Sequence, residues 1–331
     1  MIQVGSFFAG MGGFDWAFCK VGGFETVYAN DVSEFALKHF MHNLPGVRAE
    51  KKDVWKINSR ELPDFDLLCG GFPCQAFSQA GRQAGRQVGR QEARGRLFYA
   101  LLPIIRTKKP AILFLENVKG LKTFDNGQFL LDILQELNNL GYFCKYKVIN
   151  AKDYGPPQNR ERIYIIGFKN FEHYKNFDFP TCTSTEEERI LRARELIDWR
   201  GEYDSEFYAD TTKCGYGLQV LRFCEAADFW PGDRGFRRIG RCVKSRDDIF
   251  YTLCRKTDVF DNMEFLMAFS GRVRSVTPHE ALRIQGYEGY KLLAGYNARR
   301  YYGIIGNSVA IEVIKVIAEN IKKAVGENEQ K

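Results

Sequence analysis

A cysteine and a glutamate, each directly after a short apolar segment, are the residues best suited to covalent chemistry. Cys74 follows the Gly-Gly-Phe-Pro segment at 70–73, and Glu116 follows the apolar run at 111–115. A thiol in such a turn can face a substrate, and a nearby helix N-terminus or cation favours the thiolate that attacks. A neighbouring carboxyl group with a raised pKa can hold or transfer a proton. Because a lone cysteine is usually a buried apolar residue, this interpretation depends on Cys74 and Glu116 acting together.

A glycine-rich turn at residues 10–13 follows the first apolar segment and suits a ligand that the backbone must approach closely. Taken alone, it fits a plain strand-to-helix connection equally well. Its spacing differs from the G-x-G-x-x-G of dinucleotide sites, which disfavours a nicotinamide oxidoreductase. Asp31 ends the second apolar segment, where a carboxylate can accept hydrogen bonds from ribose hydroxyls. The alternative interpretation of Asp31 is an acid at a helix N-terminus.

Alternating strand and helix signals in the first half of the chain position these residues. Helices are predicted at 13–21, 33–42 and 129–140, and strands at 2–8, 26–29, 66–69, 111–115, 142–149 and 162–168. This order predicts an α/β fold with a mostly parallel, doubly wound sheet. Ligands of such sheets bind outside the carboxyl ends of the strands, which is where the residues singled out above fall.

The second half of the chain has a different organisation. Residues 172–271 are irregular and predict a smaller inserted domain, with one helix capped by Ser184 or Thr185. Helical periodicity resumes near Thr277, and residues 309–324 predict an amphipathic helix. We therefore expect a large domain over residues 1–171, an inserted domain over 172–271, and a return segment over 272–331 whose last helix packs on the large domain.

The composition fits a globular protein and leaves its partners open. The 331 residues, 45% hydrophobic and 27% charged, suggest about two domains and exclude a disordered or fibrous chain. The net charge of +7 permits a nucleic-acid partner without demanding one. Nine cysteines form no C-x-x-C pair, and His39 and His42 have no evident partner ligands. We therefore expect surface histidines and no metal site.

Neither a signal peptide nor a membrane-length apolar run is apparent, so we expect a cytoplasmic, nucleoid-associated protein. Two segments are strongly basic. Residues 78–109 contain eight Lys/Arg and one acid, and residues 234–246 contain six cations and no acid. Their arginines can meet phosphates or guanine edges, although a solvated surface is the alternative for each segment.

Six sequence elements together resemble the DNA cytosine-5 methyltransferases, in the order found in that family. They are the segments at 8–13, 71–75, 116–118, 158–162, 274–286 and 306–309. The resemblance spans nearly the whole chain and is interrupted only at 171–271, where the family has its variable target-recognition region. It implies a Rossmann-like S-adenosylmethionine-dependent methyltransferase sheet with an inserted target-recognition domain.

The resemblance also implies roles for individual residues. Cys74 would add to C6 of cytosine, Glu116 would contact N3 and the exocyclic amine, and Arg162 would hold the flipped base and position Glu116. Arg160 belongs to the same catalytic set. The cofactor S-adenosylmethionine, which leaves as S-adenosylhomocysteine, would contact Phe8, Gly10, Gly12, Gly13, Asp31, Asp53, Pro73, Leu97, Asn307 and Val309. DNA would contact Gln75, Ser78, Arg82, Arg86, Arg90, Arg94, Arg237, Arg238, Arg241 and Thr252.

The implied partner is double-stranded DNA, bound by a monomer, with a cognate restriction endonuclease as a further candidate in the same system. The target base must leave the duplex to be attacked. Two alternatives remain open: a tRNA cytosine-5 methyltransferase of the same superfamily, and a catalytically silent DNA-binding relative. The intact set of Cys74, Glu116 and Arg162 argues against the silent relative. The chain departs from the family at Asp31, where Glu is usual, and at Glu288 and Ile304, where Pro and Gln are frequent.

Overall fold

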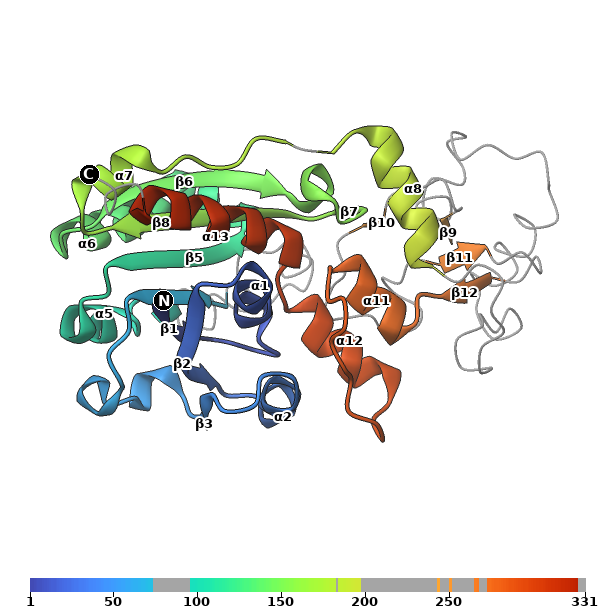
Figure 1. The fold of residues 1–331 in the computed structure, drawn as a ribbon, viewed down its shortest axis with the longest axis horizontal. Coiled ribbons are helices and arrows are strands. Elements are labelled where there is room, and N and C mark those ends of the chain that lie inside the picture. Colours follow the sequence, from blue (N-terminus) through green and yellow to red (C-terminus); the bar gives the residue numbers. More distant parts are fainter. Residues whose placement is uncertain are drawn as a thin grey trace. The chain divides into compact units, whose positions relative to one another are not determined.

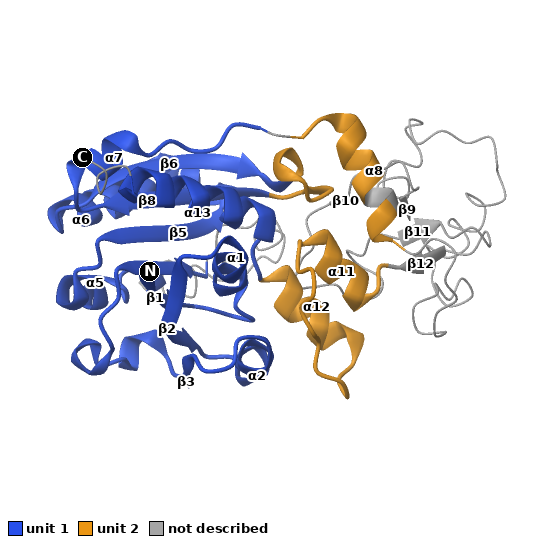
Figure 2. Ribbon diagram, in the orientation of Figure 1, with its two compact units in different colours: residues 1–151, 161–182, 308–331 blue, residues 152–160, 183–307 orange. Residues whose placement is uncertain are grey.

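The computed structural model describes residues 1–73, 96–182, 184–197, 243–244, 250–251, 265–267 and 273–326. The chain divides into two compact units (Figure 2). Unit 1 contains residues 1–151, 161–182 and 308–331, and unit 2 contains residues 152–160 and 183–307. The domain boundaries expected at 171/172 and 271/272 stay predictions.

Unit 1 is built on a seven-stranded sheet in the order β3-β2-β1-β4-β5-β8-β6 (Figure 1). Its strands are β1 (Ile2–Phe7), β2 (Phe24–Asp31), β3 (Arg48–Lys51), β4 (Leu67–Gly71), β5 (Ile112–Val118), β6 (Phe143–Asn150) and β8 (Glu161–Phe168). All neighbours pair in parallel except β8, which is antiparallel to both β5 and β6. The mostly parallel α/β sheet expected from the sequence is therefore confirmed.

Six α-helices of unit 1 are described. They are α1 (Gly13–Val21), α2 (Glu34–Asn43), α5 (Leu102–Lys108), α6 (Gln128–Asn139), α7 (Phe171–Asn176) and α13 (Ile311–Gly326). The C-terminal helix α13 packs against α1 and α7, so the end of the chain returns to the unit where it begins (Figure 1). Short 3-10 turns lie at Val54–Lys56, Ser59–Glu61, Arg96–Phe98, Lys119–Lys122, Phe124–Gly127 and Ala151–Tyr154.

The central strands β4 and β5 form because each begins with a run of apolar residues. Leu68 on β4 and Leu113 and Leu115 on β5 are fully buried, as a sheet covered on both faces requires. They belong to one large hydrophobic cluster that also includes Phe7, Phe98 and Ile133 and extends under α5 and α6. This core holds the carboxyl ends of β1, β2, β4 and β5 in fixed positions.

Unit 2 contains three described helices, α8 (Glu186–Leu196), α11 (Pro278–Ile284) and α12 (Ala298–Gly306). Thr185 caps α8 in a capping box with Glu188, as predicted. Thr277 does the same for α11 with Glu280. The short strands are β7 (Gln158–Asn159), β9 (Val243–Lys244), β10 (Phe250–Tyr251), β11 (Phe265–Met267) and β12 (Val273–Ser275).

One expectation about the surface is wrong. His39 is completely buried rather than exposed, with its Nδ1 2.9 Å from the carbonyl oxygen of Phe35 one helical turn earlier. Burial lowers the pKa of this imidazole, because it disfavours the charged form. Within the described part of the chain, no helix is long and apolar enough to cross a bilayer.

Candidate functional site

The glycine turn, residues 8–13, connects β1 to α1 through an unusual run of backbone conformations. Phe8, Gly10 and Gly12 have φ angles of 53°, 58° and 86°, in the left-handed region. A Cβ on Gly12 would meet the Phe40 ring at 2.7 Å, whereas a Cβ on Gly10 would meet nothing within 4 Å. Gly12 is therefore required for packing, and Gly10 faces open space in which a ligand can approach the backbone.

Asp31 holds this turn from the end of β2. One carboxylate oxygen accepts a hydrogen bond from the Gly10 N–H at 2.8 Å, and the other accepts from the Ser33 N–H at 2.7 Å. Burial raises the pKa of this carboxyl group, and the backbone hydrogen bonds oppose the rise. The Ser33 contact is the one expected of an acid at the N-terminus of α2. Each oxygen retains a second lone pair that can accept from a hydroxyl.

Asn30 is a residue of this region that the sequence analysis did not single out. Its buried side chain donates to the backbone oxygens of Glu50 at 3.2 Å and Lys52 at 2.7 Å. These bonds fasten β2 to the segment that precedes Asp53, whose exposed carboxylate accepts from the Trp55 N–H. Its position directly before Asp31 at a strand end was the available signal.

Phe8 and Leu97 both pack against the same large hydrophobic cluster of unit 1. Val309 is buried in this unit just before α13, and Pro73 is exposed at the end of the segment after β4. The structure thus places the predicted cofactor residues Phe8, Gly10, Asp31 and Leu97 on or beside the glycine turn, its brace and the adjoining core.

Glu116 and Arg162 form an ion pair at the adjoining strands β5 and β8. The Arg162 Nε lies 3.2 Å from the Glu116 Oε1, and both side chains are largely buried, at 14% and 11% exposure. Antiparallel pairing of β5 with β8 sets Val118 opposite Arg162, two residues beyond Glu116. The contact expected between Arg162 and Glu116 is therefore present in the structure.

The same end of β5 also holds the segment that leads to Cys74. Gly71 on β4 pairs with Glu116, and a Cβ on Gly71 would lie 3.0 Å from the Glu116 Oε2. The buried Asn117 side chain donates to the Phe72 carbonyl oxygen at 3.0 Å. Cys74 follows Phe72 by two positions and itself lies outside the described residues.

Arg160 lies in unit 2 in a different environment. It is buried, and its Nη2 donates to the Gly306 carbonyl oxygen at 3.1 Å, directly before Asn307. Gln158 donates to the Gln285 side chain at 3.4 Å, and Gln285 donates to the Ile305 carbonyl oxygen at 3.0 Å. This buried network joins β7 to α11 and α12, and Asn307 is exposed at the end of α12.

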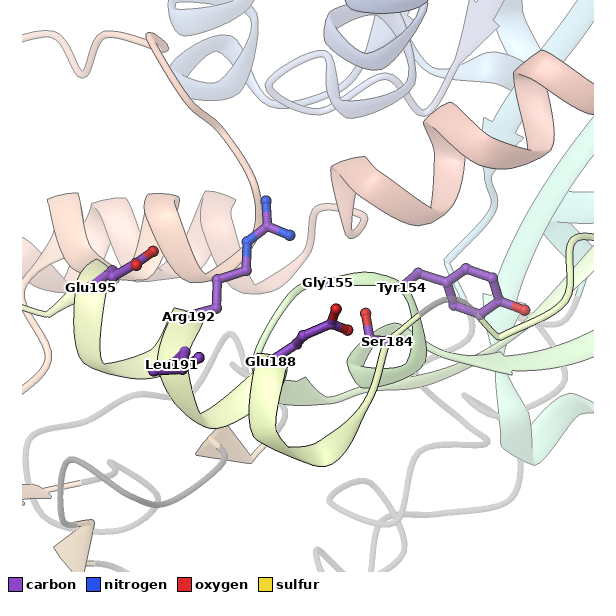
Figure 3. Close-up of a pocket in the computed structure, with 7 residues that line it drawn as sticks. All are labelled: Tyr154, Gly155, Ser184, Glu188, Leu191, Arg192 and Glu195. Carbon is purple, nitrogen blue, oxygen red and sulfur yellow. The ribbon is translucent and has the colours of Figure 1, made fainter.

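A separate pocket of about 510 Å³ lies within unit 2 (Figure 3). Glu188, Arg192 and Glu195 line it from α8. Tyr154 and Gly155 line it from the turn at residues 151–155. An ion pair of 3.2 Å between Arg189 and Asp153 fastens the helix to that turn. The pocket is lined by none of the predicted site residues, and its two carboxylates disfavour a phosphate ligand.

The DNA-contacting residues predicted from the sequence lie outside the described residues, so they stay predictions. They are Gln75, Ser78, Arg82, Arg86, Arg90, Arg94, Arg237, Arg238, Arg241 and Thr252. In the described part of the chain, no group of three or more His, Cys, Asp or Glu residues could hold a metal ion.

The chain is similar to known Type II methyltransferases over nearly its whole length. Relative to the Type II methyltransferase M.Bsp6I of Bacillus sp. (strain RFL6), the chain is 37% identical over 327 residues, which are 98% of this chain and 100% of that protein. It is 33% identical over 328 residues to the Type II methyltransferase M.HhaI of Haemophilus parahaemolyticus, covering 95% and 92% of the two chains.

Solved structures share the fold. The Dnmt2 methyltransferase of S. pombe superposes with a TM-score of 0.73 at 16% identity, covering 98% of this chain and 99% of that one. The methyltransferase EhMeth of Entamoeba histolytica gives a TM-score of 0.72 at 16% identity, covering 100% and 99%. The sequence model of the family described as "C-5 cytosine-specific DNA methylase" matches residues 2–323. The chain therefore belongs to the family of C-5 cytosine-specific DNA methylases.

Proposed function

We propose that this enzyme transfers a methyl group from S-adenosylmethionine to C5 of a cytosine in double-stranded DNA, with Cys74 as nucleophile. The observation that supports these roles most directly is the Glu116–Arg162 ion pair beside Gly71, three residues before Cys74. A carboxyl group, a guanidinium and a thiol that follows closely in the chain are the groups that covalent activation of a pyrimidine needs. The family membership supports the DNA substrate.

The chemistry assigned to each residue follows from the low reactivity of the cytosine C5 atom toward a methyl donor. C5 of cytosine is a poor nucleophile, so the Cys74 thiolate adds to C6. The C5=C6 double bond becomes single, and its electron pair forms a C4=C5 enamine that is nucleophilic at C5. Glu116 stabilises the ring by a hydrogen bond at N3, and Arg162 keeps the Glu116 carboxyl group in place. S-adenosylmethionine supplies the electrophilic methyl group when bound. A base then removes the C5 proton, the C6–S bond breaks, and the thiolate is restored.

The residues of the glycine turn fit the cofactor that we propose. Gly10 leaves open space above its backbone, and Asp31 offers lone pairs for ribose hydroxyls. S-adenosylmethionine has no phosphate group, which fits a turn without a lysine. We assign Phe8, Asp53, Pro73, Leu97, Asn307 and Val309 to the same ligand on the family motif, together with Gly12 and Gly13, and we expect no metal.

DNA binding is assigned to the two basic segments, at 78–109 and 234–246, with the target base flipped out of the duplex. Arg160 is placed with the catalytic set on the family motif. We further propose that the protein acts as a monomer and belongs to a restriction-modification system with a cognate endonuclease. The tRNA alternative has no described residue in its favour, and the matched family is described as DNA methylases.

Covalent trapping tests the proposal. A duplex with 5-fluorocytosine at its target position lacks the C5 proton, so the enzyme should remain bound through Cys74 after methyl transfer. We expect a denaturation-resistant complex that needs S-adenosylmethionine, and its absence from Cys74→Ser. A purified protein that binds DNA and S-adenosylmethionine but never forms this complex would support the silent relative instead. Trapping by Cys74→Ser would refute the nucleophile assignment.

A further inference from the structure

Asp15 is a completely buried carboxylate in unit 1 that the proposed chemistry does not use. It lies in the first turn of α1, two residues after the glycine turn, and is 2% exposed. The Ser6 hydroxyl donates to one carboxylate oxygen at 2.9 Å, and the Thr26 hydroxyl donates to the other at 2.8 Å. Burying a carboxylate is costly, so such a group needs a reason to be present.

The two hydroxyls come from different strands, and this gives the carboxylate its mechanical effect. Ser6 is on β1, one residue before its end and two before Phe8, whereas Thr26 is on β2. Asp15 therefore connects the strand that enters the glycine turn, the neighbouring strand that ends in Asp31, and the helix that leaves the turn.

The helix itself has no other side-chain cap at this end. Gly12 occupies the N-cap position of α1 in a left-handed conformation and has no side chain to bond the free N–H groups. A negative charge in the first turn interacts favourably with the helix dipole. The titratable group facing Asp15 from β4 is Cys69, whose pKa is raised by burial and by the Asp15 charge, so this thiol stays neutral.

We propose that Asp15 is a positioning residue for the methyl donor: its two hydrogen bonds hold β1, β2 and α1 together and so fix the backbone of the glycine turn that binds S-adenosylmethionine. This inference rests on the proposed function. Asp31 holds the turn itself by accepting a hydrogen bond from the Gly10 N–H. Asp15, on the helix after the turn, accepts a hydrogen bond from Ser6 on the strand before it. The loss of Asp15 should therefore loosen the turn and weaken cofactor binding without changing the catalytic groups.

Four variants separate the hydrogen bonds from the charge. Asp15→Leu keeps the approximate shape and removes both bonds, and Asp15→Asn keeps the shape with an amide that can still bond both hydroxyls. Thr26→Val removes one bond with a nearly isosteric side chain. Thr123→Val is the matched control, because Thr123 is exposed and bonds only weakly, at 3.4 Å, to the Gly120 carbonyl oxygen.

Three readouts are measured on the full chain at pH 8: binding, steady-state kinetics and hydrogen exchange. Calorimetry should show about tenfold weaker S-adenosylmethionine binding for Asp15→Leu, about threefold for Thr26→Val, and native binding for Asp15→Asn and Thr123→Val. Thr26→Val should raise KM for S-adenosylmethionine while kcat at saturation stays native. Hydrogen exchange of the ligand-free protein should be faster at residues 8–14 in Asp15→Leu and Thr26→Val, with β5 and β8 unchanged.

Native affinity and native exchange in both Thr26→Val and Asp15→Leu would overturn the inference, as would a lower kcat with unchanged KM in Thr26→Val. If Asp15→Leu does not fold, Thr26→Val alone decides the matter. Failure of the unmodified protein to bind S-adenosylmethionine would refute the proposed function instead. The exchange data on the ligand-free protein would then still show whether Asp15 holds the turn.

Discussion

Glu116 and Arg162 depend on one another because both are largely withdrawn from water. At 11% and 14% exposure, each charged side chain would be costly to bury alone. The 3.2 Å contact satisfies part of both groups and leaves the other Glu116 oxygen beside Gly71. At the scale of single residues, the structure therefore offers a carboxyl group that a guanidinium holds in place at the end of β5, beside Gly71.

Glu116→Gln tests this arrangement. The amide keeps the shape but cannot shuttle a proton, so we expect kcat to fall by about 10²–10⁴-fold. Binding of S-adenosylmethionine, measured by calorimetry, should stay within about twofold of native. Glu172→Gln is the control, because Glu172 is exposed and forms an ion pair with Lys175 on the same helix. Loss of cofactor binding in Glu116→Gln would show that Glu116 belongs to the cofactor site.

Asp15 makes stability depend on pH. Burial raises the pKa of its carboxyl group from 3.8 to about 6. Below the unfolded pKa both states are protonated; between the two values the unfolded chain ionises first, so folded stability falls as pH rises. The loss is about 3 kcal/mol and is complete above the folded pKa.

Asp15→Asn cannot ionise, so this part of the pH dependence should disappear. Urea unfolding between about pH 4 and pH 7 should show the native protein losing about 3 kcal/mol relative to Asp15→Asn. If the free energy of unfolding changed with pH in the same way for the native protein and Asp15→Asn, the raised pKa of Asp15 would be contradicted.

Residue-level predictions from the sequence succeeded where a motif carries the information. The Glu116–Arg162 contact was expected from the family resemblance. The burial of His39 was not, because a histidine at a helical position gives no sign of which face meets the core. The two backbone contacts of Asp31 also needed the fold, because they depend on where the Gly10 N–H points.

The glycine turn is an element whose function depends on backbone shape. Gly10 and Gly12 both have positive φ angles, but their surroundings differ. Gly12 is packed against Phe40 and Leu44, whereas Gly10 opens to free space. Gly12 is therefore needed for packing, and Gly10 leaves space beside its backbone.

Alanine substitutions should separate these two roles. Gly12→Ala combines backbone strain with a 2.7 Å contact to Phe40 and should destabilise the protein by about 2–4 kcal/mol. Gly10→Ala carries only the strain, about 1–2 kcal/mol, but should weaken S-adenosylmethionine binding because the methyl group occupies the ligand's space. Urea unfolding and calorimetry measure both effects. If Gly10→Ala destabilised the protein as much as Gly12→Ala does and still bound S-adenosylmethionine with native affinity, the ligand-facing role of Gly10 would be contradicted.

Most elements of unit 1 were predictable because their periodicity is strong, and α8 because Thr185 and Glu188 form a capping box. Strand β3, Arg-Ala-Glu-Lys, was missed because a short polar edge strand has no apolar alternation. Helix α5 was missed because its seven residues lie within the basic segment and begin next to a proline, which can start a helix as well as break one.

At the scale of the whole molecule, the positive charge is uneven. Eight Lys/Arg and one acid lie within residues 78–109, although the net charge of the chain is only +7. Such a segment suits a polyanion, and affinity that arises from phosphate contacts depends strongly on salt. Periodicity and composition alone did not reveal how the second half of the chain is organised, because the strands described between residues 243 and 275 are only two or three residues long.

A triple variant in which glutamine replaces Arg82, Arg86 and Arg90 tests the role of this segment. If each arginine meets a phosphate, the slope of log K against log salt should decrease by about 3. In the control variant, glutamine replaces Lys56, Lys122 and Lys323, which are all exposed and outside the segment. Its slope should stay within about 0.5 of the slope of the unmodified protein. Titration of a fluorescent duplex at several salt concentrations measures both. An unchanged slope in the arginine variant would assign those side chains to solvent.

Methylation of unmodified plasmid DNA and bulk tRNA with S-adenosylmethionine, read by bisulfite sequencing, tests the central claim most directly. We predict that cytosines in the DNA become resistant to conversion, all within one short sequence context, and that the tRNA stays unmodified. Modified tRNA with untouched DNA would contradict the substrate, and no modification of either by a protein that binds S-adenosylmethionine would contradict the activity.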